Sequence, residues 1–381
     1  MRAPLRVGVA GVHGHGRGHV DAVLALAEEG VSLVAVADPR GSGEVPSHTA
    51  YFVDAADMID GGDLDIVVLS TPIPTHAPLA LRALEVGAHV LLEKPPVASV
   101  ADHGLVCAAS SGAGRAVQVG FQSLASAGVE AATDLVASGA IGDLLHIGAA
   151  GLWSRSDQYW ARAPWAGHRI ANGRVVADGA ATNPLAHALA TALTIAGASE
   201  PAEVEAIDLD MYRAAEIETD DTSSLAVTLT SGIRIIAALS VTAPHRHEPY
   251  VLLRGTHGYA VYNYTLDVLS VFRDGSPLPR VFTFARRGLL AELVAHARSG
   301  DDISVPIART GTFTRVLEAI TTSPSPAQVP EALITHRSRQ GESFRIVNGV
   351  EEWTERAVWE GRTFAELGAP WAKDRPMPTR G

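Results

Sequence analysis

A glycine-rich turn between an apolar segment and an amphipathic one is the feature that most restricts the fold of this chain. Residues 5–10 (LRVGVA) read as a buried parallel strand, and residues 11–18 form the turn. Val20, Val23 and Leu24 then recur at helical spacing. Glycine allows close approach to the backbone, and the helix that follows directs N–H groups and its positive dipole end toward the turn. This arrangement is typical of a site for a dinucleotide pyrophosphate.

Strands and helices alternate through the remainder of the first third of the chain. Helical segments separate strand-like, apolar segments at residues 31–37, 65–70, 89–92 and 116–120, with a weaker one near 50–53. Such alternation predicts a parallel sheet with right-handed crossover connections. We therefore expect residues 1–122 to form a Rossmann domain that binds a nicotinamide dinucleotide.

The pattern changes after residue 122. Strand-like stretches, several with alternating polarity, follow between residues 144 and 272. They predict an α+β domain over residues 123–345 with a large, mostly antiparallel open sheet, one face of it covered by a helix near 184–196. A helical tail is expected over residues 346–381, with its apolar side formed by Trp353, Val358 and Phe364.

Composition restricts the class of protein and its partners. Asp and Glu number 42 against 30 Lys and Arg, a formal charge of -12, which argues against a nucleic-acid partner. Cys107 is the single cysteine, so no disulfide can form within the chain, and a reducing cytoplasm fits this. We find neither a signal-peptide pattern nor an apolar run of the ~18 residues that a membrane span needs. A cytoplasmic protein without a membrane partner is expected.

The turn itself departs from the usual dinucleotide pattern. Read against G-x-G-x-x-G, Gly11 and Gly16 hold the first and third glycine positions, while His13 stands at the second. Gly14 is the alternative residue for the close approach to the pyrophosphate, and His15 lies beside it. We expect all five residues to contact the cofactor. The turn alone would equally fit an ordinary glycine-rich loop.

Asp38 shifts the balance toward a cofactor site. It follows the second strand, 22 residues after Gly16, where a carboxylate can accept both hydroxyls of the adenosine ribose. Negative charge at this point repels a 2′-phosphate, so NAD is favoured. Arg40 leaves NADP possible, because an arginine here could pair with that phosphate. The other interpretation of Asp38 is a turn-forming residue before Pro39.

Three histidines near the turn raise the question of a metal. His15 and His19 are four residues apart, and His13 precedes them. No cysteine or carboxylate lies close enough in sequence to complete a set of ligands, so we expect no metal site. Imidazoles near a pyrophosphate are the simpler interpretation.

Two further segments carry a family resemblance. The strand at 65–70 runs into Thr-Pro-Ile-Pro-Thr-His at 71–76, and the strand at 89–92 runs into Glu-Lys-Pro-Pro at 93–96. With the glycine turn and His19, these motifs resemble the Gfo/Idh/MocA oxidoreductases, of which the Glu-Lys-Pro element is the most specific mark. The resemblance extends, more loosely, through Gly-Phe-Gln at 120–122 and other stretches up to residue 197.

The resemblance implies roles for several residues. Lys94 should meet the hydroxyl or carbonyl that loses or gains hydride, and a lysine at a strand end beside a cofactor can exchange a proton. Glu93 should approach the nicotinamide ribose. The other residues expected at the cofactor are Thr71, Pro72, His76 and Gln122. The resemblance also implies a large open sheet that often mediates dimerisation, hence a homodimer or homotetramer.

The second domain departs from the family pattern. The family usually supplies D-x-x-x-H at the start of a helix, and here Asp178 fits the aspartate while Thr182 stands at the histidine position. A threonine hydroxyl can hydrogen-bond a sugar but cannot act as a base near neutral pH. We expect Asp178 to remain at the substrate, with His187 as the nearest substitute for the acid–base histidine. Asn183 is a candidate for substrate binding or a helix cap.

The loop before this region is rich in aromatic residues. Tyr159 and Trp165 suit stacking on a sugar ring, although aromatic residues are as often part of a core. The arginine that is common in the family after the Gly-Phe motif is absent, and Ser123 and Leu124 stand there instead.

Together these features predict an NAD(P)-dependent oxidoreductase that acts on a sugar, cyclitol or similar polyol. One alternative is an enzyme that uses NAD without net redox, of glycosidase, epimerase or lyase type. Another is a non-catalytic sensor of NAD(P) on the same fold. The altered pair Asp178 and Thr182 leaves both alternatives open.

Overall fold

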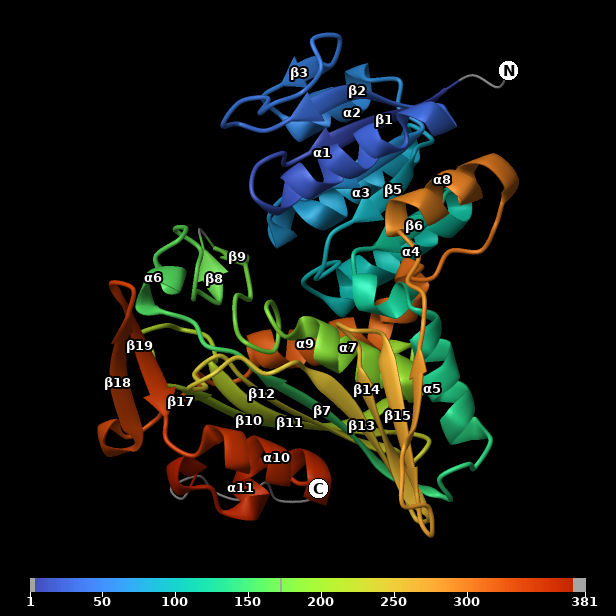
Figure 1. Ribbon diagram of the computed structural model, residues 1–381. Coiled ribbons are helices and arrows are strands. Elements are labelled where there is room, and N and C mark those ends of the chain that lie inside the picture. Colours follow the sequence, from blue (N-terminus) through green and yellow to red (C-terminus); the bar gives the residue numbers. More distant parts are fainter. Residues whose placement is uncertain (1–3, 172, 373–381) are drawn as a thin grey trace. The chain divides into compact units, whose positions relative to one another are not determined.

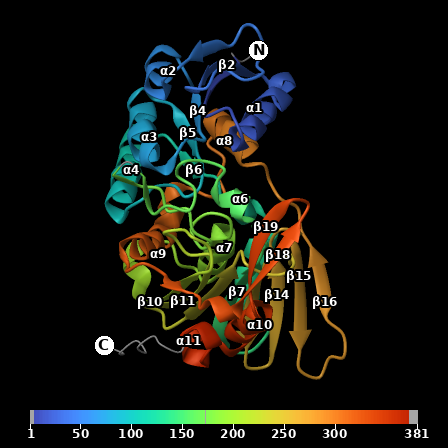
Figure 2. The same ribbon diagram turned by 90° about the vertical axis from the view of Figure 1, so that its left-hand side faces the viewer.

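The computed structural model describes residues 4–171 and 173–372. It divides the chain into two compact units (Figures 1 and 2). The first unit contains the described residues up to Ala125 together with Arg287–Thr314, and the second contains the described residues of 126–286 and 315–372. The predicted second domain, residues 123–345, includes residues 287–314, whereas this segment folds with the first unit.

The first unit is built on a six-stranded parallel sheet with the strand order β3-β2-β1-β4-β5-β6. Its strands are β1 (Leu5–Ala10), β2 (Val31–Ala37), β3 (Ala50–Phe52), β4 (Ile66–Leu69), β5 (His89–Leu92) and β6 (Val117–Val119). Its helices are α1 (His15–Ala25), α2 (Ala55–Gly61), α3 (His76–Glu85), α4 (Val100–Ala113) and α8 (Leu289–Ser299). The central strands are buried along their length, as expected for a parallel sheet with helices on its faces. The predicted Rossmann domain is confirmed.

Hydrogen bonds from buried side chains hold the returning segment in the first unit. The Gln118 amide on β6 is fully buried and donates to the Leu289 carbonyl at 2.9 Å and to Glu292 Oε2 at 3.0 Å. The His103 ring on α4 lies 2.9 Å from the Ile307 carbonyl. Buried polar groups require partners, and these partners come from a part of the chain that no local pattern connects to the sheet.

The second unit contains a nine-stranded sheet with the order β16-β15-β14-β13-β7-β12-β11-β10-β17. Its strands are β7 (Leu144–Leu152), β10 (Val204–Arg213), β11 (Thr222–Leu229), β12 (Arg234–Ser240), β13 (Tyr250–Gly255), β14 (Gly258–Asn263), β15 (Val268–Arg273), β16 (Arg280–Thr283) and β17 (Ala327–Gln328). Most neighbours are antiparallel, as predicted. Two pairs are parallel, β7 with β12 and β10 with β17, so the sheet is mixed.

Helices cover both faces of this sheet (Figure 1). The helices α5 (Ala127–Ala137) and α7 (Ala186–Ile195) pack together, and α7 lies on β7, β12 and β13. The helix α10 (Val350–Glu360) covers the other face and is followed by α11 (Phe364–Leu367). At Gly148 on β7, an added Cβ would lie 2.4 Å from Val358 Cγ1, so the close approach of α10 requires this glycine. The predicted apolar side of the tail, with Trp353, Val358 and Phe364, packs in the core beneath the sheet.

Shorter elements complete the second unit. They are α6 (Asp157–Trp160), the two-stranded sheets β8 (Ile170–Ala171) with β9 (Arg174–Val175) and β18 (Ile334–Arg339) with β19 (Glu342–Val347), and α9 (Gly311–Thr322), within which the division between the units falls. Among the residues that the structure describes, no helix combines the length and apolar character needed to cross a membrane.

Asp221, just before β11, gives the stability of the second unit a pH dependence. Its Oδ2 accepts the backbone N–H groups of Ala214 and Ala215 at 2.7 and 2.8 Å, which fixes the connection from β10. Burial, with a smaller contribution from the neighbouring Asp220 carboxyl, raises the pKa of Asp221 to about 7. The protonated form is therefore favoured in the folded state, and its stabilising effect is present below about pH 4 and is lost as the pH rises toward 7.

Between about pH 4 and 7, we expect the unfolding free energy of Asp221→Asn to decrease less than that of the original chain. A shift of about three pKa units corresponds to roughly 4 kcal/mol across this range. Urea unfolding at several pH values measures the slope, with the exposed Asp274→Asn as the control. An unchanged slope in Asp221→Asn would show that the carboxyl does not titrate in this range.

Candidate functional site

The glycine turn connects β1 to α1 and depends on two close backbone contacts. Gly11 has a φ of +80°, and an added Cβ there would lie 2.2 Å from the Ser70 carbonyl oxygen. At Gly16, an added Cβ would lie 1.6 Å from the Gly11 carbonyl oxygen. Gly14 also has a positive φ, but among the described residues no atom lies within 4 Å of a Cβ added there. The structure thus explains why Gly11 and Gly16 must be glycine, and the first turn of α1 points its N–H groups out of this bend.

Asp38 lies just after β2 and is almost completely buried. Its Oδ2 accepts the Val12 N–H at 3.1 Å, and the Arg40 guanidinium binds both carboxylate oxygens at 3.0 Å. Burial acts to raise the pKa of Asp38, but the hydrogen bonds from Arg40 and Val12 outweigh it and keep this pKa below its usual value. Arg40 is therefore bound to Asp38, and its positive charge is partly neutralised.

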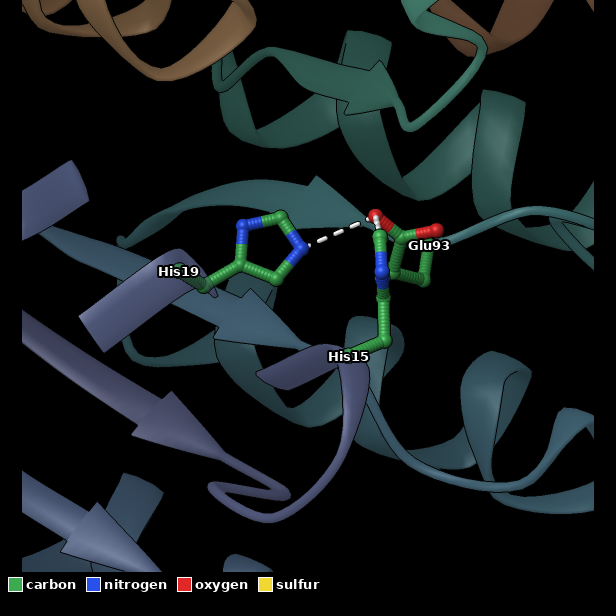
Figure 3. A group of neighbouring side chains, drawn as sticks. All are labelled: His15, His19 and Glu93. Carbon is green, nitrogen blue, oxygen red and sulfur yellow. Dashed lines mark hydrogen bonds and ion pairs between the residues drawn. The ribbon is translucent and has the colours of Figure 1, made fainter. Parts of the chain in front are cut away.

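His15, His19 and Glu93 meet beside the turn, as Figure 3 shows. The Glu93 Oε1 atom, just after β5, lies 3.2 Å from His15 Nε2 and 2.8 Å from His19 Nε2. Burial opposes ionisation of Glu93, yet the hydrogen bonds from the two imidazoles hold its pKa well below the usual range. The hydrogen bond to Glu93 in turn raises the pKa of His15. No local pattern in the sequence indicates this cluster, because its members lie on α1 and after β5, more than 70 residues apart.

His76, at the start of α3, is fully engaged by backbone groups. Its Nδ1 lies 3.0 and 3.1 Å from the carbonyl oxygens of Pro95 and Pro96, and its Nε2 lies 2.7 Å from that of Thr71. Burial lowers the pKa of His76 despite these hydrogen bonds. This side chain braces the loops at the ends of β4 and β5, so its surroundings favour a positioning role over contact with a cofactor.

The remaining residues expected at the cofactor lie in the same unit. His13 Nε2 is 3.2 Å from the Gly41 carbonyl oxygen, and the Thr71 hydroxyl is 2.7 Å from that of Thr75. Pro72 precedes a short 3-10 turn, and Gln122 begins another after β6. Lys94 follows Glu93, and its N–H donates to Glu93 Oε2 at 3.1 Å. The predicted cofactor residues therefore follow the carboxyl ends of parallel strands, where open α/β sheets bind ligands.

In the second unit, Asp178 is buried and saturated with hydrogen-bond donors. Arg162 Nη2 lies 2.7 and 2.8 Å from its two oxygens, Asn183 Nδ2 donates to Oδ1 at 2.6 Å, and the Gly167 N–H donates to Oδ2 at 2.9 Å. The Thr182 hydroxyl is also buried, and it donates to the Ala177 carbonyl at 2.5 Å. Both side chains are occupied in fixing the loop before α7, so their surroundings do not favour the substrate contacts that the sequence suggested.

Two aromatic residues of the loop before α7, Tyr159 and Trp165, pack against the guanidinium of Arg162. Its guanidinium carbon lies 3.9 Å from the ring centroid of Tyr159 and 4.8 Å from that of Trp165. Burial raises the pKa of the Tyr159 hydroxyl. The two rings therefore stack on an arginine of their own loop, which is a different partner from the sugar ring that we expected. Arg162 itself was missed, since its partners become neighbours only in the folded loop.

Comparison with known proteins decides the family. A family model described as an oxidoreductase family with an NAD-binding Rossmann fold matches residues 5–121, and a model of the GFO/IDH/MocA C-terminal domain matches residues 129–261. Together these segments span more than half of the chain. This protein belongs to the Gfo/Idh/MocA oxidoreductase family. Its first unit is accordingly an NAD-binding domain.

Curated relatives align with only part of the chain. An inositol 2-dehydrogenase of Rubrobacter xylanophilus is 38% identical over 143 residues, which are 36% of this chain and 41% of that protein. A glycosyl hydrolase family 109 protein of Shewanella sp. is 35% identical over 105 residues, which are 24% of this chain and 22% of that protein. The alignments thus span less than half of these relatives.

Solved structures share the fold over both units. The WlbA dehydrogenase of Bordetella pertussis, solved in complex with NADH and UDP-GlcNAcA, superposes with a TM-score of 0.67 at 21% identity. The match covers 83% of this chain and 95% of that one. At this identity the likeness establishes the fold of the Gfo/Idh/MocA family and no detail of the site.

The structure favours a different alignment of the family's D-x-x-x-H motif, with Asn183 at the aspartate position and His187 at the histidine position. Asn183 and His187 are also four residues apart, with Asn183 just before α7 and His187 on its first turn. Both side chains are half-buried, in contrast to the buried Asp178 and Thr182. Asp178 is the only aspartate between residues 175 and 187, which favours the first alignment, whereas the shared spacing of Asn183 and His187 is the signal in the sequence for the second. Helical spacing puts His187 and Thr191 on one side of α7, and this side is not solvent-exposed throughout, because Thr191 is fully buried.

Proposed function

We propose that this protein is an NAD-dependent dehydrogenase that transfers hydride to or from a carbinol carbon of a sugar, cyclitol or similar polyol. The observation that carries the proposal is the set of residues after the parallel strands of the first unit, namely the glycine turn, Asp38, Glu93 and Lys94. The inositol 2-dehydrogenase relative supports the substrate class. The nicotinamide would carry the hydride, as in other enzymes of this chemistry.

The residues of the chain would bind, orient and move a proton. Lys94 is the proposed group that gives a proton to, or takes one from, the reacting oxygen. His187 is the proposed second acid–base group, and Asn183 holds the place of the family's aspartate. Asp178 serves as a positioning residue, since it orients both Arg162 and Asn183. Assembly through the nine-stranded sheet, into a homodimer or homotetramer, stays a prediction.

An assay of NADH formation with a panel of polyols tests this function. We expect oxidation of at least one cyclitol, aldose or nucleotide sugar, with NADH formed in equal amount to the ketone or lactone product. A substrate that is converted without any release of NADH would favour the redox-neutral alternative instead. The glycosyl hydrolase relative is the observation that keeps this second function in view.

We expect NAD⁺ to bind more tightly than NADP⁺, by roughly tenfold or more, which is about 1.4 kcal/mol. The reason is that Asp38 is ionised and holds Arg40, so a 2′-phosphate would meet a carboxylate and an arginine that is already paired. Calorimetric titration of the chain with each cofactor measures the ratio.

Asp38→Ala supplies the control, because it removes the carboxylate and releases Arg40. This variant should bind NADP⁺ more tightly than the original chain and NAD⁺ more weakly. Equal affinities in the original chain would show that Arg40, and not Asp38, determines the choice of cofactor.

A further inference from the structure

The cluster of His15, His19 and Glu93 has the donor set of a metal site (Figure 3). His15 and His19 lie one turn apart on α1, so their rings project from the same side of the helix. The two Nε2 atoms and the Glu93 carboxylate oxygen all lie within 4.8 Å of one another. Two imidazole nitrogens and one carboxylate oxygen are the protein ligands of several open zinc sites.

Contacts around Glu93 fix its carboxylate in place. The Lys94 N–H donates to Oε2 and leaves Oε1 facing the two imidazoles. An added Cβ at Gly120 would lie 2.8 Å from the carboxyl carbon of Glu93, so a glycine is needed beside it. Such supporting contacts orient a metal ligand before any ion binds. The carboxylate is therefore ordered in the position that a ligand requires.

We propose that His15, His19 and Glu93 bind one divalent transition-metal cation, for which Zn²⁺ is the best match. Zinc binds imidazole nitrogen and carboxylate oxygen at about 2.0–2.2 Å, which places neighbouring donors of a tetrahedral site roughly 3.4 Å apart. The observed distances from Glu93 Oε1 are 3.2 Å to His15 Nε2 and 2.8 Å to His19 Nε2. They would need to widen by about 0.2 and 0.6 Å to reach this spacing. The cation would then replace the hydrogen bonds that now join the three groups.

The three side chains of the cluster differ in their exposure to solvent, and this difference suits an open metal site. The side chains of Glu93 and His19 are 7% and 13% exposed, whereas that of His15 is 65% exposed. A cation held by all three would therefore be shielded on one side and reach solvent on the side of His15. Three protein ligands leave a fourth position, which water or an oxygen donor of a bound molecule fills.

This inference reverses the expectation from sequence that no metal binds here. That expectation depended on the lack of a carboxylate near His15 and His19 in the chain. The fold supplies one, because Glu93 lies 74 residues after His19 and still reaches its ring. The spacing of the two histidines was a valid signal, and the parallel sheet provided the missing ligand.

Calorimetric titration of the full chain with ZnCl₂, after treatment with a chelator, tests the proposal. We expect one tight equivalent of Zn²⁺, and with Co²⁺ a visible absorption band typical of four-coordinate binding. His15→Gln is the decisive variant, because its exposed side chain can be replaced without disturbing the fold. It should weaken Zn²⁺ binding by more than the roughly 10- to 100-fold that loss of an outer-shell partner costs, as should His19→Gln. Circular dichroism confirms that each variant is folded.

A second histidine pair provides a matched control. His245 Nδ1 and His247 Nε2 lie 3.8 and 2.6 Å from Glu351 Oε1 in the second unit, but the carboxylate here is 36% exposed, in contrast to the buried Glu93. His247→Gln should leave the tight equivalent intact. The proposal is overturned if the original chain binds no stoichiometric Zn²⁺, if His15→Gln binds it equally well, or if His247→Gln removes it.

Discussion

Replacing Lys94 with alanine is expected to reduce turnover of an identified polyol by about 10²–10⁴-fold, the usual contribution of one positioned acid–base group. Lys94 follows β5 in the first unit, next to the ordered Glu93 carboxylate. Its side chain does not form the glycine turn or contribute to the Asp38 ion pair. The dinucleotide affinity should therefore stay close to that of the original chain, and kcat should account for the loss. Steady-state kinetics and calorimetric titration with NAD⁺ measure the two effects.

Two companion variants make this result specific. Lys94→Arg keeps the positive charge but cannot give up its proton, so it should fail in the same way as the alanine variant. His187→Asn should cost roughly 10²-fold if His187 shares the proton transfer. Near-normal turnover in Lys94→Ala would show that the lysine is structural and would remove the central residue of the proposed mechanism.

Replacing Arg162 with methionine is expected to destabilise the second unit by about 3 kcal/mol. The substitution removes both hydrogen bonds from Arg162 to Asp178. The Asp178 carboxylate then stays buried with only neutral donors. It also removes the cation between Tyr159 and Trp165. Urea unfolding followed by tryptophan fluorescence is a suitable measurement, since all 6 tryptophans lie in the second unit.

Asp178→Asn completes a double-mutant cycle with Arg162→Met. When both changes are present, no unpaired carboxylate remains buried and no guanidinium is left without its carboxylate partner. The double variant should therefore be less destabilised than the sum of the single variants, by roughly 1–2 kcal/mol. Additive costs would show that the two side chains do not interact, which would contradict the pairing that fixes the loop before α7.

The sequence predicted the fold of the first unit because the signals there are local. A buried parallel strand, a glycine turn and an amphipathic helix succeed one another within about thirty residues, and each depends on neighbours in the chain. Gly11 and Gly16 are required by contacts within the turn and at the adjoining end of β4. For the same reason the strand ends that carry Asp38, Glu93 and Lys94 could be located without a structure.

The candidate site residues of the second unit are harder to assign from sequence, since its buried polar side chains form hydrogen bonds with one another. The position of Asp178 in the chain matches a substrate-binding aspartate, and nothing in the sequence shows that Arg162, Asn183 and Gly167 enclose it. The long separation of β7 from its parallel partner β12 is likewise not encoded in any local pattern. Alternating polarity identifies a strand but leaves the choice of its neighbours to the whole sheet.

The sequence by itself determined the alternation of strands and helices up to residue 122, the glycine turn and the family motifs, because these depend on periodicity and on residues adjacent in the chain. Only the tertiary structure decided which distant groups meet. It joined the segment Arg287–Thr314 to the first unit and Arg162 to Asp178. It also brings Glu93 into contact with His15 and His19. The reason is that a parallel sheet places the residues that follow its separate strands at one edge, however far apart they lie in sequence.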